Sequence, residues 1–210
     1  MKNKLLLFFV LVSCKHDDLQ RVISFYNSEG KMPREVYSVI SDSPNVKQGV
    51  YLLYAEDGKL KEKRTYSSNR IVDTLYQYYP SGKFSERALY RNGLPNGFRN
   101  VYFENGEMMV EEQYRDGLLN GNYTSYYENR KSKQQGQYVN GNREGLWKFY
   151  YATSELNEEI NFKNNEADGS YKSYYKMGKV KVIGSYEKGL KSGEWKTFYE
   201  NGNLMEDLNY

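Results

Sequence analysis

The 210-residue sequence has a single cysteine, Cys14, and a single histidine, His16. An intrachain disulfide is therefore excluded. A zinc site made of cysteine and histidine is excluded too, because it needs three or four such ligands. Any catalytic triad that uses histidine would have to recruit His16, close to the N-terminus. These absences predict a protein without a cofactor or a metal.

Apolar residues are also scarce, at 39% of the chain, whereas a globular domain has roughly 45–50%. A large three-dimensional core is therefore not expected. The net charge of +3 provides no basic surface for nucleic acid, so no nucleic-acid partner is predicted. Tyrosine is abundant instead, with 23 copies. A tyrosine ring buries apolar area while its hydroxyl stays in water, which suits a thin sheet.

The N-terminal residues resemble an export signal followed by a lipid attachment site. Two lysines precede a short apolar run within residues 1–12, and a membrane-spanning helix would need about 20 apolar residues. This order is typical of a signal peptide, which we assign to residues 1–13. Residues 11–14 (LVSC) resemble the bacterial lipobox, whose cysteine is acylated. Cys14 is therefore the predicted lipid attachment site, with a secretory signal and an incidental cysteine as the alternative.

Several acyl chains on one residue anchor a protein stably to a membrane. In lipoproteins of the Escherichia type, aspartate after the acylated cysteine retains the protein in the inner membrane. Lys15 stands there in this chain, so the resemblance implies the outer membrane, with the protein facing either the periplasm or the surface. Residues 14–24 form a predicted polar tether.

A repeat of 24 residues fills residues 49–210 in seven copies. Glycine marks position 1 of the copies, with Asp73 in the only gap. Positions 6 and 18 are aromatic in every copy, and two aromatic ladders in one register cannot arise by chance. The copies begin at Gly49, Asp73, Gly97, Gly121, Gly145, Gly169 and Gly193.

Each copy has the pattern of a β-hairpin. Positions 2–8 are rich in aromatic and β-prone residues, and pairs such as Asn105-Gly106 occupy positions 9 and 10. Such pairs favour a type I′ turn, which would place position 7 opposite position 12. A second turn is predicted at positions 20 and 21. Two copies have Arg130 and Ser154 at position 10, so looser or longer turns are expected there.

The predicted fold class is therefore all-β. Seven hairpins would form an elongated antiparallel β-meander, in a single sheet that is twisted or trough-shaped. Residues 25–48 are predicted to form a degenerate half repeat and a loop that cap the array. The last strand, within residues 204–210, is a candidate edge for pairing, and the oligomeric state is left open.

Residues 140–151 (NGNREGLWKFYY) and 189–204 (GLKSGEWKTFYENGNL) resemble the MORN repeat in its bacterial variant. This variant occurs in proteins of the antitoxin-component (YwqK) type. The resemblance implies an elongated sheet that serves as a scaffold or adaptor, without catalytic residues. An antitoxin ordinarily meets its toxin in the cytoplasm, whereas this chain has a predicted export signal.

Together these features predict a non-catalytic envelope lipoprotein that binds a partner, a protein or a glycan, through its repeat sheet. The alternatives are an antitoxin or immunity-like protein, and a glycan-binding protein that stacks sugars on aromatic rings. Candidate binding residues are the aromatic side chains of positions 3 and 7, although most of them are expected to serve as packing. They are Tyr51, Tyr123, Trp147, Tyr171 and Trp195 at position 3, and Tyr79, Phe103, Tyr127, Tyr151, Tyr175 and Tyr199 at position 7.

An enzyme is the remaining alternative. Position 14 carries a carboxylate in four copies, and a glycosidase uses two carboxylates about 5–9 Å apart. Recurrence at a repeat position indicates a solvated structural role, so no enzyme is predicted. The four residues are Glu62, Glu86, Glu158 and Glu206.

Overall fold

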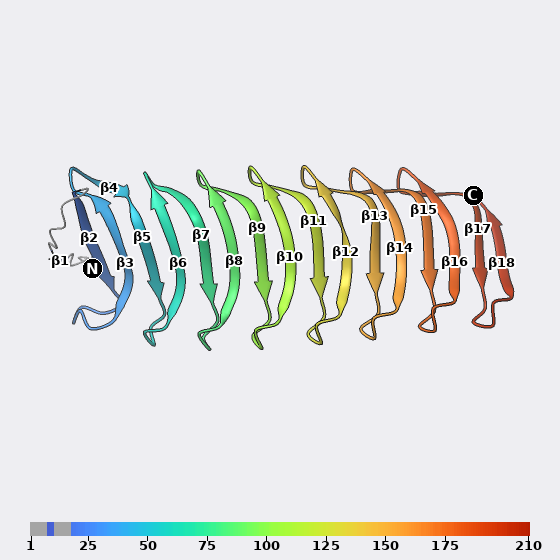
Figure 1. The fold of residues 1–210 in the computed structure, drawn as a ribbon, viewed down its shortest axis with the longest axis horizontal. Helices are drawn as coiled ribbons and strands as arrows, with labels where there is room; N and C mark the ends of the chain where they lie inside the picture. Colours follow the sequence, from blue (N-terminus) through green and yellow to red (C-terminus); the bar gives the residue numbers. More distant parts are fainter. Residues whose placement is uncertain (1–7, 11–17) are drawn as a thin grey trace, which may run out of the picture. The chain divides into compact units, whose positions relative to one another are not determined.

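The computed structural model describes residues 8–10 and 18–210 (Figure 1). Cys14 and His16, with most of the predicted signal peptide, lie outside the described residues. The chain divides into two compact units, Met1–Gly106 (unit 1) and Glu107–Tyr210 (unit 2). The described residues contain strands and turns but no helix, and hence no helix that is long and apolar enough to cross a membrane.

Unit 1 is an antiparallel sheet. Strand β2 pairs with β1 and β3, and β3 also pairs with β4 and β5. From β5 to β9 each strand pairs with the next one in the chain. The strands are β1 (Phe8–Val10), β2 (Leu19–Phe25), β3 (Pro33–Ile40), β4 (Ser43–Lys47), β5 (Gly49–Tyr54), β6 (Leu60–Ser67), β7 (Arg70–Tyr78), β8 (Phe84–Arg91) and β9 (Leu94–Tyr102).

Unit 2 is a regular hairpin meander, in which every strand from β10 to β18 pairs antiparallel with the next. The prediction of an all-β fold built as an antiparallel hairpin meander is thus confirmed. The strands are β10 (Met108–Arg115), β11 (Leu118–Tyr126), β12 (Ser132–Val139), β13 (Asn142–Tyr150), β14 (Leu156–Lys163), β15 (Glu166–Tyr174), β16 (Val180–Glu187), β17 (Leu190–Phe198) and β18 (Leu204–Asn209).

The turn at positions 7–11 differs from the predicted type I′ turn. In a representative copy the Gly178 amide donates to the Tyr175 carbonyl (2.8 Å), and the Tyr175 amide donates to the Lys179 carbonyl (2.8 Å). Only position 10 has a positive φ, 79° at Gly178. This is a three-residue loop, a type I turn followed by a left-handed residue in a bulge. Position 6 consequently lies opposite position 12, as Tyr174 does opposite Val180, and the predicted pairing of positions 7 and 12 is wrong.

The two copies without glycine at position 10 keep the same turn. The Arg130 amide donates to the Tyr127 carbonyl, and the Ser154 amide donates to the Tyr151 carbonyl, both at 2.9 Å. The expectation of looser or longer turns is therefore wrong. Arg130 and Ser154 adopt positive φ angles of 68° and 94°, so the hairpin geometry prevails over the preference of a side chain for negative φ.

The type I′ turn occurs at positions 20 and 21, where both residues have positive φ, as at Asn92 (54°) and Gly93 (86°). These turns are joined from one repeat to the next. The Gly93 amide donates to the Ile71 carbonyl, and the Gly189 amide donates to the Ala167 carbonyl, each at 2.8 Å. The turn edge of each unit therefore adds backbone hydrogen bonds to those between the strands.

Candidate functional site

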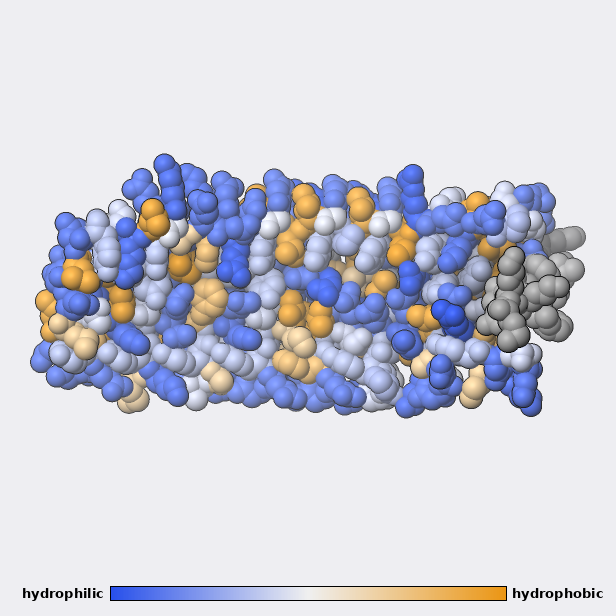
Figure 2. All heavy atoms as spheres, turned by 180° about the vertical axis from the view of Figure 1, so that it is seen from behind, coloured by the Kyte–Doolittle hydropathy of each residue, from blue (hydrophilic) through white to orange (hydrophobic). Residues whose placement is uncertain are grey.

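Alternation along each strand gives the sheet two faces. We call the face that carries positions 3, 5, 14, 16 and 18 the Trp face, because in unit 2 it holds Trp147 and Trp195. Positions 2, 4, 6, 15 and 17 form the opposite face. Figure 2 shows one side of the molecule, where hydrophobic residues lie in separate small patches among hydrophilic ones.

The structure buries most of the candidate binding residues at position 3. Tyr51 is 5% exposed, Trp147 is 0% exposed and Trp195 is 6% exposed. Tyr123 and Tyr171 are partly buried beside them. The rings pack in pairs, with centroids 5.5 Å apart for Tyr123 and Trp147 and 5.3 Å apart for Tyr171 and Trp195.

The two tryptophans fit because a glycine lies beside each ring. A Cβ atom added at Gly136 would lie 2.2 Å from Cδ2 of Trp147, and one added at Gly184 would lie 2.2 Å from Cδ2 of Trp195. The indole N–H of Trp147 donates to the Gln137 carbonyl at 3.2 Å. Each ring therefore covers the backbone of the preceding strand, where the pairing register also shifts. Such a β-bulge bends the strand locally.

Cationic side chains cover the same rings. The guanidinium of Arg143 lies 4.7 Å from the Trp147 ring centroid, and Nζ of Lys191 lies 4.5 Å from that of Trp195. In unit 1, Arg64 lies 4.8 Å from the Tyr51 ring. Such cation–π contacts stabilise by about 0.5–1 kcal/mol when exposed, and more when buried. A ligand that stacks on these rings would have to displace a cation.

The candidate residues at position 7 link neighbouring repeats. The Tyr79 hydroxyl donates to the Tyr102 carbonyl at 2.6 Å. In unit 2 the hydroxyls of Tyr127, Tyr151 and Tyr175 donate to the position-6 carbonyl of the next repeat, each at 2.8 Å. Phe103 has no hydroxyl to donate, and Tyr199 is largely exposed. Tyr26, before the array, makes the equivalent bond to the Tyr54 carbonyl at 2.7 Å.

The position-14 carboxylates lie on the Trp face, and three of the four are buried or partly buried instead of solvated as predicted. Glu62 is buried and pairs with Arg64, while Glu86 pairs with Arg99 at 2.7 Å. Glu158 accepts a hydrogen bond from the Tyr171 hydroxyl at 3.4 Å, and burial raises its pKa. Only Glu206 is exposed. Among the described residues no group of three or more histidine, cysteine or acidic side chains could hold a metal ion.

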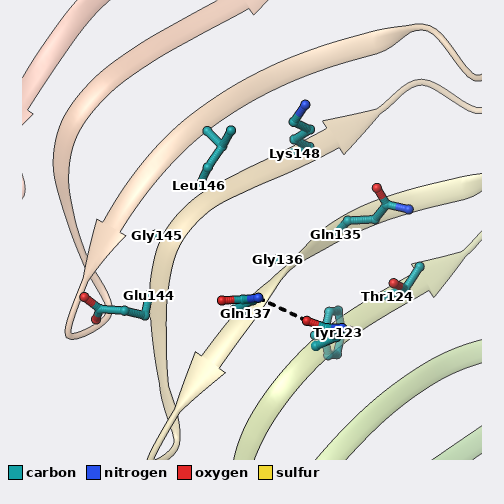
Figure 3. Close-up of a pocket in the computed structure, with 10 residues that line it drawn as sticks. Tyr123, Thr124, Gln135, Gly136, Gln137, Glu144, Gly145, Leu146 and Lys148 are labelled. Carbon is teal, nitrogen blue, oxygen red and sulfur yellow. Dashed lines mark hydrogen bonds between the residues drawn. The ribbon is translucent and has the colours of Figure 1, made fainter.

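A groove of about 480 Å³ lies on the opposite face of unit 2 (Figure 3). Three neighbouring strands, β11, β12 and β13, contribute its walls. Most of its lining residues have polar side chains, beside the apolar Leu146. The lining residues are Asn122, Tyr123, Thr124, Gln135, Gly136, Gln137, Glu144, Gly145, Leu146 and Lys148.

Hydrogen bonds hold the groove side chains in place but leave some of their donors and acceptors unused. The Gln137 amide donates to Asn122 Oδ1 at 3.1 Å, and Gln135 Oε1 accepts from the Tyr150 hydroxyl at 3.0 Å. Lys148 pairs with Glu159 at 3.3 Å. A side-chain amide has two N–H donors and two acceptor lone pairs, so these groups can still bind a polar ligand.

Sequence reasoning missed this groove because its residues stand at positions that vary from repeat to repeat. Positions 2, 4, 15 and 17 build no ladder of identical residues, so the repeat pattern does not mark them as it marks the aromatic positions. One signal was available. Residues 134–137 read QQGQ, a cluster of amides around a glycine that no other copy contains.

The fold and the two faces define a β-hairpin repeat protein. The family model of the MORN repeat variant matches four segments, residues 47–68, 143–164, 167–188 and 191–210. Each segment covers one hairpin, namely β5–β6, β13–β14, β15–β16 and β17–β18. The resemblance to this repeat is therefore confirmed in those hairpins. No curated protein matches the chain.

Proposed function

We propose that this protein is a non-catalytic lipoprotein of the cell envelope that binds a partner through the groove on the opposite face of unit 2. The observation that supports this most directly is the contrast between the faces. The rings of the Trp face are buried and already contact cations and glycine backbone. The groove, in contrast, presents amide, hydroxyl and charged groups that retain hydrogen-bonding capacity.

The groove proposal is tested by Gln137→Ala. Because Gln137 is on the surface of β12, the fold should persist while an amide is lost from the binding surface. Asn161→Ala is the matched control, since Asn161 occupies the same position 17 one repeat later and lies outside the groove. Crosslinking and pull-down from intact envelopes should recover one dominant partner with the unmodified protein and the control. At least a fivefold smaller yield is expected with Gln137→Ala, and equal yields from both variants would contradict the proposal.

The envelope anchor rests on the sequence at Cys14 alone. Cys14→Ala should move the protein from the membrane fraction to the soluble fraction, because acyl chains on that residue provide the attachment. Persistent membrane association of this variant would contradict the anchor without affecting the groove.

A glycan is the second candidate ligand. Amide, hydroxyl and carboxylate groups beside an apolar side chain, here Leu146, suit a sugar with many hydroxyls. A glycan array that is positive for the unmodified protein and negative for Gln137→Ala, together with an empty pull-down, would favour this ligand. Capture of a secreted toxin would instead favour the immunity-like activity.

A further inference from the structure

The charged side chains of unit 1 are sorted between the two faces of its sheet. Strands β5–β9 contain three acidic residues, and the pairing register places all three on the Trp face. They are Glu62, Asp73 and Glu86. Two of them form ion pairs on that face, Glu62 with Arg64 and Glu86 with Arg99. The opposite face of these described strands therefore has no carboxylate of its own.

Basic residues lie on that opposite face instead. Lys63 and Arg87 flank Tyr76 in one row across β6, β7 and β8, and strands about 4.8 Å apart separate the two cations by about 10 Å along the sheet. Arg70 and Arg91 lie on the same face, at the strand ends next to the turns at positions 20 and 21. Within the described residues, the exposed Lys63, Arg70 and Arg87 form no ion pair with a carboxylate.

Apolar side chains are exposed among these cations. Val50, Phe84 and Leu94 are all exposed on this face. Phe98 is 63% exposed, and it stands two residues before the cross-strand partner of Arg87. Exposed apolar side chains that are interspersed with polar ones are typical of a protein interaction site.

Aromatic rings hold the side chain of Arg87 against the sheet. Its guanidinium lies 5.8 Å from the ring centroids of both Tyr76 and Phe84. The Phe84 ring in turn packs against Tyr78 and Tyr102, with centroids 5.1 and 6.5 Å away. A guanidinium that stacks on rings keeps the N–H donors along its edge available. Because a carboxylate accepts two such donors in parallel, Arg87 is oriented to bind a carboxylate.

We propose that the opposite face of β5–β9 binds an acidic segment of a partner protein that carries carboxylates and apolar side chains together. The carboxylates meet Arg87 and Lys63, and the apolar side chains cover Phe84 and Phe98. Charge complementarity sets the sign of the partner. The exposed apolar side chains favour a protein over an anionic sugar, which would place hydroxyl groups against them. A bilayer fits less well, because the apolar residues are spread from β5 to β9 instead of gathered at one tip.

A labelled synthetic peptide in which glutamate alternates with phenylalanine serves as the probe. Fluorescence anisotropy with the full chain should show saturable binding that weakens as the salt concentration rises. A peptide with lysine in place of glutamate should bind at least tenfold more weakly, and so should a peptide with serine in place of phenylalanine.

Two substitutions test the two kinds of contact. Arg87→Glu should weaken binding of the probe at least tenfold, and Phe98→Ser should weaken it at least threefold. The matched controls are Lys31→Glu, in the exposed loop between β2 and β3, and Met177→Ser, at an exposed turn of unit 2. Both controls should leave the affinity within twofold of the unmodified protein. Unchanged hydrogen exchange of β5–β9 in all four variants shows that the fold persists.

Three results would overturn the proposal. The first is the absence of saturable binding of the probe. The second is equal affinity of Arg87→Glu, Phe98→Ser and their controls for the probe. The third is binding of phosphatidylglycerol vesicles or a heparin oligosaccharide that Arg87→Glu abolishes and that exceeds binding of the probe. Gln137→Ala, which tests the groove of unit 2, should leave binding of the probe unchanged, so the two proposals can fail separately.

Discussion

Around β8 and β9 of unit 1 the Trp face is filled by an ion pair, whereas around β12 and β13 of unit 2 it is filled by an aromatic ring. In unit 1, Arg99 pairs with Glu86, and the neighbouring position-16 residue is the buried Ala88. In unit 2 the equivalent neighbours are Trp147 and Gly136. Both units nevertheless keep the same pairing register and the same two turns. The hairpin frame therefore tolerates either filling, provided that the two neighbouring side chains are matched in size.

The largest expected loss of stability comes from removing the buried aromatic ring of the Trp face. Trp147→Ala should destabilise the hairpins around β13 by about 3–5 kcal/mol, since it removes a fully buried ring and leaves a cavity. Hydrogen exchange of β12–β14 measures this locally. Leu146→Ala, on the opposite face of the same strand and 44% exposed, is the control and should cost under about 1 kcal/mol. Equal effects would mean that the ring is not the packing centre of unit 2.

Matching in size is tested by Gly136→Ala. The added Cβ would collide with the Trp147 ring, so a loss of about 1–3 kcal/mol is expected. Combining it with Trp147→Leu should cost less than the sum of the two single changes, because the smaller side chain makes room for the methyl group. Urea unfolding of the unmodified protein, the two single variants and the double variant gives the coupling energy. Strict additivity would show that the pair is not matched.

The ion pair on the Trp face of unit 1 should respond differently to substitution. Arg99→Met leaves the partly buried Glu86 without its ion-pair partner, and a loss of about 1–2 kcal/mol is expected, reduced from the fully buried case by the exposure of both groups. Changing both residues, with Glu86→Leu added, should restore most of the stability. Thermal unfolding compares the variants. A double variant no more stable than Arg99→Met would mean that the unpaired carboxylate of Glu86 is not the cause of the loss.

The smallest effect concerns a carboxylate of unit 2. Burial raises the pKa of Glu158 in the folded state, so its contribution to stability is complete below the unfolded pKa, near 4.5, and declines as the pH rises through the folded pKa. Glu158→Gln removes this decline. The free energy of unfolding of the Glu158→Gln variant, relative to that of the unmodified protein, should therefore increase from pH 4 to pH 7. Urea unfolding at each pH measures this difference. A difference that does not change with pH would refute the raised pKa of Glu158.

Much of the fold could be predicted from the sequence, because the aromatic and glycine ladders fix the length and phase of the hairpin. The turn type was missed because Asn-Gly and Asp-Gly pairs occur at both turns. Pro80, at position 8, contained the missing information. Proline is favoured at the second residue of a type I turn and glycine at the fourth, and Gly82 stands there.

The filling of the Trp face and the groove could not be predicted in the same way. The absence of a side chain at Gly136 has meaning only once Trp147 is known to lie against it, and the two residues are on different strands. Burial of Glu62 likewise depends on Arg64 folding over it. Such pairwise compensation varies between copies, so a ladder of identical residues cannot reveal it.

The meander also determines how unit 2 responds to force. Each strand is bonded only to its neighbours along the chain within the unit, so a pull on Tyr210 loads its two backbone hydrogen bonds with Gly193 first. The remaining bonds of β17–β18 then break in sequence, as in a zipper. Rupture of the Tyr175 hydroxyl bond to the Phe198 carbonyl separates one repeat from the next. At about 3.4 Å per residue, each repeat of 24 residues releases roughly 80 Å of chain, so unit 2 is expected to lengthen in equal steps at low tension.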